Sequence, residues 1–195
     1  MYFHLAYLIF FRGKHQPDTI REHVEVSLNN HYAVLIFNYR WTNVFHCKWG
    51  DDDFTKAVCN VATEERFKMA NGITISPDRK TVFVNDPLDM NIMALARNTE
   101  TGQLTKSYDI HLPSMVDNIE YDDEANEIVL GNILPGGMAV LTKIAAGDDD
   151  TSWVTNGVLK HDETKLKGIS AAARLGKSKF VMGSPFSEGI LVCTK

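Results

Sequence analysis

Side chains whose oxygen atoms suit a metal ion come directly before the apolar strands that the sequence predicts. Asn71 precedes one such strand, and the pair Asp117 and Asn118 precedes another. Asp18 stands before a looser third match. A carboxylate with side-chain amides, and without clustered thiols or imidazoles, forms a hard oxygen site that suits Ca²⁺ better than zinc or copper. The residue types therefore indicate a calcium site, provided that the fold brings them together.

The same residues also have a purely conformational explanation. Asn–Gly and Asp–Asn pairs are frequent in turns because these residues tolerate positive φ angles. Spacing by itself leaves the metal site and the turn as open alternatives.

The stretch from Ala70 to Asn85 predicts the element that positions Asn71. Ile73 and Ile75 alternate with Thr74, a Ser–Pro–Asp turn follows, and a second apolar strand returns. This alternation is typical of a β-hairpin that faces a core.

The hairpin recurs along the chain, at residues 118–132 and 168–184, with a looser match near Ile20. The three clear copies open 46 and 50 residues apart, at Ile73, Ile119 and Ile169. This pitch is typical of β-propeller blades. The first strand of each propeller blade runs along the central channel, so the residues that lead into these strands should converge.

Other apolar segments predict the remaining strands. They lie at residues 5–11, 24–28, 33–37, 44–49, 55–61, 91–96, 103–111 and 138–144.

Composition describes an ordinary globular chain with 44% hydrophobic and 23% charged residues. The formal net charge is −5, and the basic residues are scattered, so we expect no nucleic-acid partner.

The apolar start, Met1 to Phe11, is too short to cross a bilayer and lacks the basic region of a secretory signal, so we expect neither a transmembrane segment nor a signal peptide.

The three cysteines, Cys47, Cys59 and Cys193, lack the paired spacing of a zinc site. Cys47 and Cys59 could face each other across a hairpin, but two small buried thiols are the favoured interpretation. Cys193 has no evident partner in the sequence.

Two motifs resemble the paraoxonase/arylesterase family, which consists of six-bladed propeller hydrolases related to gluconolactonase-type proteins. The first is Phe-Lys-Met-Ala-Asn-Gly-Ile-Thr-Ile-Ser-Pro-Asp at residues 67–78, and the second is Val-Asp-Asn-Ile at residues 116–119. The likeness runs from about Val44 to the C-terminus. It implies an all-β fold, a partial six-bladed β-propeller with about three to four blades present. We expect one incomplete domain over residues 1–195, with residues 1–40 poorly matched.

The resemblance implies that Asn71, Asp117 and Asn118 bind the family's catalytic calcium. Asp18 is the candidate for a ligand from an earlier blade, with Pro17 where the family has Asn. The family's other ligands and its catalytic histidine pair come from an N-terminal half that has no counterpart here.

Two further residues are candidates for a substrate pocket. Residues 29–32, Asn-Asn-His-Tyr, resemble a pocket segment of the family, which makes His31 a candidate; a histidine in a surface turn is the alternative. Phe186 belongs to a segment that resembles the family's closing strand.

The sequence thus predicts a calcium-dependent hydrolase of small esters or lactones, in an active, inactive or partial form. The alternative is a non-catalytic binding or scaffold propeller that has lost the catalytic half.

Overall fold

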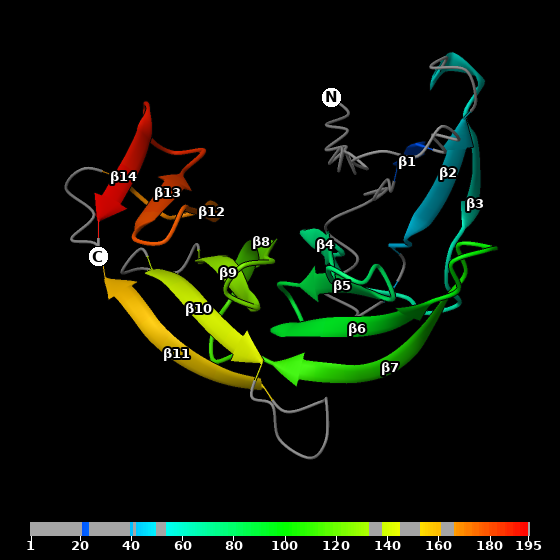
Figure 1. Cartoon of the computed structure of the whole chain (residues 1–195), viewed down its shortest axis with the longest axis horizontal. Coiled ribbons are helices and arrows are strands. Elements are labelled where there is room, and N and C mark those ends of the chain that lie inside the picture. Colours follow the sequence, from blue (N-terminus) through cyan, green and yellow to red (C-terminus); the bar gives the residue numbers. More distant parts are fainter. Residues whose placement is uncertain are drawn as a thin grey trace.

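The computed structural model describes residues 21–23, 40, 42–49, 54–132, 138–144, 153–160 and 166–194. In these ranges the chain forms strands and one short 3₁₀ helix, Phe54–Lys56. The strands make four antiparallel sheets that follow one another around an open arc (Figure 1). The predicted all-β fold, with the architecture of a partial propeller, is confirmed.

Each sheet contains strands that are consecutive in the chain. The first contains β1 (Arg21–His23), β2 (Phe45–Trp49) and β3 (Val58–Val61). The second contains β4 (Ile73–Ile75), β5 (Thr81–Asp86), β6 (Asn91–Arg97) and β7 (Leu104–His111). The third contains β8 (Val116–Asp122), β9 (Glu127–Asn132), β10 (Met138–Ile144) and β11 (Trp153–Lys160). The fourth contains β12 (Ala171–Leu175), β13 (Lys179–Gly183) and β14 (Ile190–Thr194).

The first strands of the last three sheets lie on the concave side of the arc, and β7 and β11 lie on its convex side (Figure 1). β4 contacts β8, and β8 contacts β12, so the inner strands are neighbours in space. This is the arrangement in which the residues that lead into the inner strands come together.

Apolar side chains fill the spaces between successive sheets. The first cluster includes Val44, Phe67, Val84 and Leu95. The second includes Phe83, Ile92, Ile119 and Leu130, and the third includes Val129, Ile169, Phe180 and Met182. Burial of these faces supplies the main driving force that holds the sheets together.

Arg174 adds a polar link between the third and fourth sheets. Its guanidinium on β12 forms ion pairs with Asp122 of β8 and Glu127 of β9. It also lies over the ring of Phe180, 4.9 Å from the ring centroid. The three charged side chains are only 10–16% exposed, so each depends on the others to compensate its charge.

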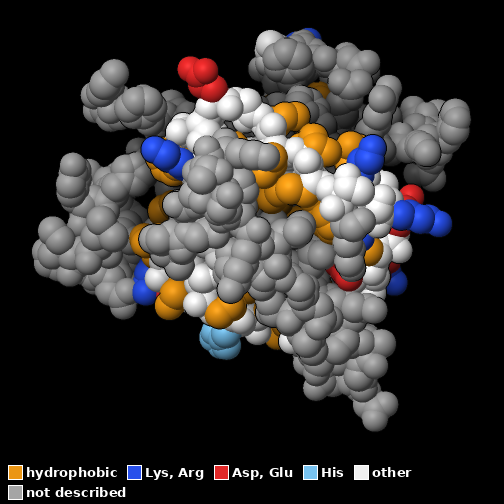
Figure 2. All heavy atoms as spheres, turned by 90° about the vertical axis from the view of Figure 1, so that its left-hand side faces the viewer, with side chains coloured by type: hydrophobic (Ala, Val, Ile, Leu, Met, Phe, Trp, Pro, Cys, Tyr) orange, Lys and Arg blue, Asp and Glu red, His pale blue; other side chains and the backbone are white. Residues whose placement is uncertain are grey.

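The two sheets in the middle of the arc are covered more fully than the fourth. β5 and β6 bury five residues each, whereas β14 alternates between exposed and half-exposed residues. Ile190 and Val192 are 70% and 50% exposed. Figure 2, which faces this end of the arc, shows hydrophobic side chains on the described surface.

The clearest predicted hairpins have the expected register, with Ile73 opposite Val84 and Ile119 opposite Leu130. The segment 55–61 differs from prediction, since its first residues belong to the 3₁₀ helix. The third hairpin begins at Ala171 rather than Gly168.

Strand β11 was not among the predicted strands because its Asn156–Gly157 pair is typical of a turn. In the structure Val140 pairs with Val158 and Leu141 pairs with Asn156, so Gly157 is accommodated in a bulge.

Cys47 and Cys59 form a disulfide between β2 and β3, where they are direct cross-strand partners. The favoured interpretation of two buried thiols is therefore wrong. The hairpin places the two Cα atoms 4.0 Å apart, which is close enough for a disulfide. Cys193 is a half-buried free thiol on β14.

The strands predicted at residues 5–11, 24–28 and 33–37, and the looser hairpin near Ile20, lie outside the described residues. None of the described ranges contains a helix long and apolar enough to cross a membrane.

Candidate metal centre

The segments that carry Asn71, Asp117 and Asn118 meet where β4, β8 and β12 begin. The amide of Gly72 donates to the carbonyl of Asp117 at 3.2 Å. In the same way, the amide of Asn118 donates to the carbonyl of Ser170 at 3.1 Å. Ser170 thus occupies in the fourth sheet the place that Asp117 occupies in the third.

Asn71 and Asp117 are in direct side-chain contact, with the Asn71 Nδ2 donating to the Asp117 Oδ1. Both residues are buried, at 6% and 8% exposure. The Asn71 Oδ1 is also buried and accepts no hydrogen bond from any residue that the structure describes. Because buried polar atoms normally have partners, this oxygen marks a place where a donor or a cation would be favourable.

Burial raises the pKa of Asp117, and the hydrogen bond from Asn71 offsets only part of this effect. An ionised carboxylate here has lost water without gaining a cationic side chain from the described part of the chain. A bound cation would supply the missing compensation.

Asn118 contributes to the same corner of the arc but is only half-buried. Its Nδ2 donates to the Ser170 carbonyl at 2.9 Å, which fixes the side chain against the fourth sheet. Beside it is an open cavity of about 310 Å³, whose lining includes Ile119, Ala172, Val181 and Ile190. An apolar surface therefore adjoins the polar corner.

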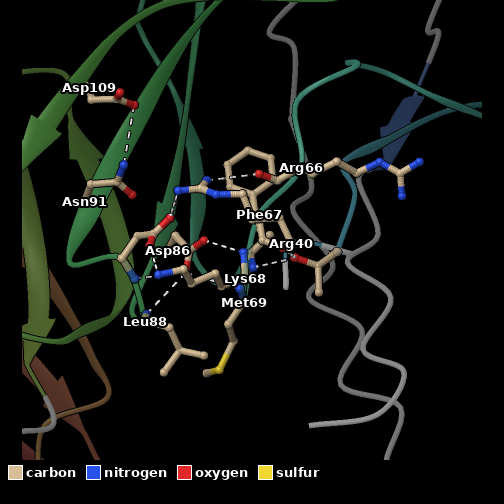
Figure 3. A network of polar contacts seen from close by, with 12 residues as sticks. Arg40, Arg66, Phe67, Lys68, Met69, Asp86, Leu88, Asn91 and Asp109 are labelled. Carbon is tan, nitrogen blue, oxygen red and sulfur yellow. Dashed lines mark hydrogen bonds and ion pairs between the residues drawn. The ribbon is translucent and has the colours of Figure 1, made fainter. Parts of the chain in front are cut away.

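Asp86, at the end of β5, holds the loop that delivers Asn71 (Figure 3). Its carboxylate accepts the backbone amides of Lys68 at 2.7 Å and Met69 at 3.2 Å. It also accepts the amide of Leu88 at 3.2 Å. Burial and the nearby charge of Asp89 raise the pKa of Asp86, and the hydrogen bonds from Lys68 and Met69 act in the opposite direction.

Thr42, in the segment before β2, supports the same loop from the other side. Its hydroxyl accepts the amide of Ala70 at 2.9 Å and donates to the carbonyl of Phe67 at 3.0 Å. The backbone that leads into Asn71 is thus held by two side chains, Asp86 from β5 and Thr42 from the segment before β2.

The structure brings the Asn71 and Asp117 side chains into contact, whereas the side chain of Asn118 is bonded to the Ser170 carbonyl. The role of all three as calcium ligands stays a prediction. Asp18 and His31 lie outside the described residues. Phe186 is 64% exposed in the loop between β13 and β14, and its role in a pocket stays a prediction.

The predicted ligands, one carboxylate and two side-chain amides, offer only oxygen atoms to a metal ion. The described residues contain no group of three or more His, Cys, Asp or Glu side chains that could hold a metal ion. Together with the unpartnered Asn71 Oδ1, the oxygen-only set fits a hard cation rather than zinc or copper. Ca²⁺ takes six to eight oxygens, so further ligands from water, substrate or other segments are required.

Sequence reasoning missed the residues that support this corner, Asn85 and Asp86. The available signal was a polar pair at the end of an otherwise apolar strand. The partners of these side chains on other segments, Lys68, Met69 and Val116, lie 17 to 31 residues away, so the register had to be known first.

The comparisons with solved structures place the fold. A protein from Lactobacillus plantarum superposes with a TM-score of 0.60 at 14% identity, covering 90% of this chain and 52% of that one. A putative 6-phosphogluconolactonase from Bacteroides uniformis gives a TM-score of 0.58 at 12% identity, covering 95% and 55%. The successive antiparallel sheets of the described residues, two with four strands and two with three, place this chain in the same class of propeller-like fold.

The family follows from the sequence. The Arylesterase family model matches residues 22–155, a range that includes Asn71, Asp117 and Asn118. The chain belongs to the arylesterase family, and the predicted resemblance is confirmed.

Curated relatives agree with this assignment. The chain is 37% identical over 129 residues to serum paraoxonase/lactonase 3 of Oryctolagus cuniculus, covering 66% of this chain and 34% of the relative. It is 33% identical over 100 residues to serum paraoxonase/arylesterase 2 of Homo sapiens, covering 51% and 26%. The chain thus spans about a third or less of the length of these relatives.

Proposed function

We propose that the protein acts as a calcium-dependent hydrolase of small esters or lactones, with Asn71, Asp117 and Asn118 among the calcium ligands. One observation carries the proposal: within the described residues, a buried carboxylate without a cationic partner contacts a buried amide whose oxygen accepts no hydrogen bond. Membership of the arylesterase family, and the names paraoxonase, lactonase and arylesterase of its relatives, supply the reaction class.

A calcium ion held at this corner supplies a Lewis acid that polarises a carbonyl oxygen and stabilises the negative charge that develops on it. The chain's own residues orient and desolvate the site. Asp117 provides the charge, Asn71 provides an unpartnered oxygen, and Asn118 lies between this corner and the apolar cavity. That cavity suits the hydrocarbon part of an ester or lactone.

A second candidate function is a binding propeller that holds calcium without catalysis. The position of the described histidine side chains favours it, because a neutral-pKa histidine is the usual general base. His46 is buried on β2 against Gly102, and His111 is exposed on the outer strand β7. Neither residue is on the inner strands that carry Asn71 and Asp117.

One experiment separates these functions. The purified chain is titrated with Ca²⁺ by calorimetry, and hydrolysis of phenyl acetate and a simple lactone is measured with and without chelator. Calcium binding with chelator-sensitive turnover supports the hydrolase. Calcium binding without turnover supports the binding propeller, and the absence of calcium binding contradicts both.

A further inference from the structure

We infer that Asn85 is a positioning residue that sets the separation between the two metal-binding segments. This inference rests on the calcium site proposed above. Asn85 lies near the end of β5 and is fully buried, at 0% exposure. Asn85 is not one of the predicted ligands. It is bonded to the segment that carries Asn71 and to the segment that carries Asp117.

The backbone of Asn85 holds the first segment. Its carbonyl accepts the amide of Asn71 at 3.0 Å, and its amide donates to the carbonyl of Gly72 at 2.9 Å. These two bonds fix the chain at the ligand Asn71 and at the residue that follows it.

The side chain of Asn85 holds the second segment. Its Nδ2 donates to the carbonyl of Val116 at 2.7 Å, across 31 residues of sequence. Val116 immediately precedes Asp117, so the same residue is bonded next to both ligands.

Gly72 shows how closely this junction is packed. A Cβ atom added at Gly72 would lie 2.8 Å from the Asn85 Oδ1, 2.8 Å from the Asn118 Cα and 2.7 Å from the Ile119 amide nitrogen. Only a glycine at position 72 leaves room for the Asn85 side chain to reach the Val116 carbonyl of the third sheet. The position of β5 relative to β8 is therefore set at this point.

The cost of keeping an amide here argues against a purely structural role. Among the described residues the buried Asn85 Oδ1 accepts no hydrogen bond, a condition that disfavours asparagine relative to an apolar side chain of the same size. The bond from Nδ2 to the Val116 carbonyl is the compensating contribution. We infer that its effect is on the geometry of Asn71 and Asp117, and hence on calcium affinity.

The test measures the calcium dissociation constant of the full chain by isothermal titration calorimetry, and the melting temperature of the calcium-free protein. Asn85→Leu keeps the branched shape of the side chain, with a larger volume, and removes the donor, and Asn85→Ala truncates the side chain as a second variant. Loss of a residue that orients metal ligands typically weakens affinity by about 10–100-fold. We expect a loss in this range from both variants.

Thr74→Val is the matched control. Thr74 is buried on β4, and its hydroxyl accepts the amide of Tyr121 at 3.1 Å, so it links the same two sheets farther from the ligands. We expect it to lower the melting temperature and to leave the dissociation constant within about twofold of wild type, well below the loss expected of an orienting residue.

The outcomes are distinct. Wild-type affinity in a folded Asn85 variant overturns the inference and leaves the proposed function standing. Equal weakening by Thr74→Val also overturns it, as does failure of both Asn85 variants to fold while Thr74→Val folds. If the wild type binds no calcium, the proposed site fails and the inference fails with it.

Discussion

The second and fourth sheets are built from similar hairpins, but they differ in what covers them. In the second sheet, the two faces of β5 and β6 contribute to different apolar clusters, so long runs of residues are buried. In the fourth sheet one face packs on the third sheet through Phe180 and Met182. The other face carries Ile190 and Val192, which are largely exposed.

This difference shows that burial in the arc depends on the neighbouring sheet more than on the hairpin itself. Apolar side chains on both faces of a strand contribute to stability only where a sheet lies on each side. The polar residues at the start of the inner strands show the same difference between the covered sheets and the fourth sheet. Asp117 is buried where two covered sheets meet, and Ser170 takes the equivalent place at the junction with the fourth sheet.

The largest effect should come from truncating a residue between covered sheets. Ile92 on β6 is fully buried, so Ile92→Ala should lower the free energy of unfolding by about 2–5 kcal/mol through lost burial and a cavity. Val192→Ala, on the half-exposed face of β14, should change it by about 0.5 kcal/mol or less. Urea titrations of both variants measure the two values, and equal losses would break the comparison.

A smaller loss is expected from the ion-pair link to the fourth sheet. Arg174→Met removes the cation and leaves Asp122 and Glu127 largely buried without compensation, which should cost about 2 kcal/mol. The control is Lys106→Met, because its pair with Asp109 is 37% and 25% exposed and should contribute at most about 1 kcal/mol. Chemical denaturation of the two variants checks the difference; a larger loss from Lys106→Met would contradict it.

The smallest effect on stability is expected from Asp117, whose carboxylate is buried between the second and third sheets. Because burial raises the pKa of Asp117, the calcium-free protein should lose stability as the pH rises from the ordinary carboxyl pKa through the raised value. Asp117→Asn removes this loss, so with chelator its melting temperature should slightly exceed that of wild type at neutral pH. With calcium present the order should reverse.

Asp78→Asn is the control of opposite sign. The hydrogen bond from Ser76 is the main cause that lowers the pKa of Asp78, so its stabilising contribution is present at neutral pH and is lost as the pH falls through the lowered value. Its replacement should therefore lower the melting temperature at neutral pH. Thermal scans across the acidic range test both variants, and the same sign in both would refute the assignment.

Local sequence signals predicted the parts of the fold that depend on local interactions. The hairpin from Ile73 to Val84 was predictable because alternation and turn residues lie within one short stretch. The same reasoning missed β11, since Gly157 fits a strand only after β10 supplies a bulged partner. The disulfide between Cys47 and Cys59 likewise follows only from the register of β2 and β3, which places the two residues opposite each other.

The candidate site also contains residues that local sequence signals indicate and one that they do not. Asn71, Asp117 and Asn118 could be proposed from the sequence because each stands just before a recognisable apolar stretch, although Asp117 and Asn118 lie within β8 in the structure. Asn85 was not found, because the partner of its side chain, Val116, belongs to another sheet. A side chain that acts between sheets has no local pattern, and only the packing of β5 against β8 gives it a role.

The order of contacts along the arc has a consequence for how the molecule opens. Strand contacts between the last three sheets run from β4 and β5 to β8, and from β8 and β9 to β12, so each sheet relies on its sequence neighbours. Stability in such a linear array is nearly a sum of local and nearest-neighbour terms, as in repeat proteins. The fourth sheet can detach while the junction of the second and third stays closed. Amide protons of β12–β14 should therefore exchange with solvent in a separate, less protected unit than those of β5 and β6.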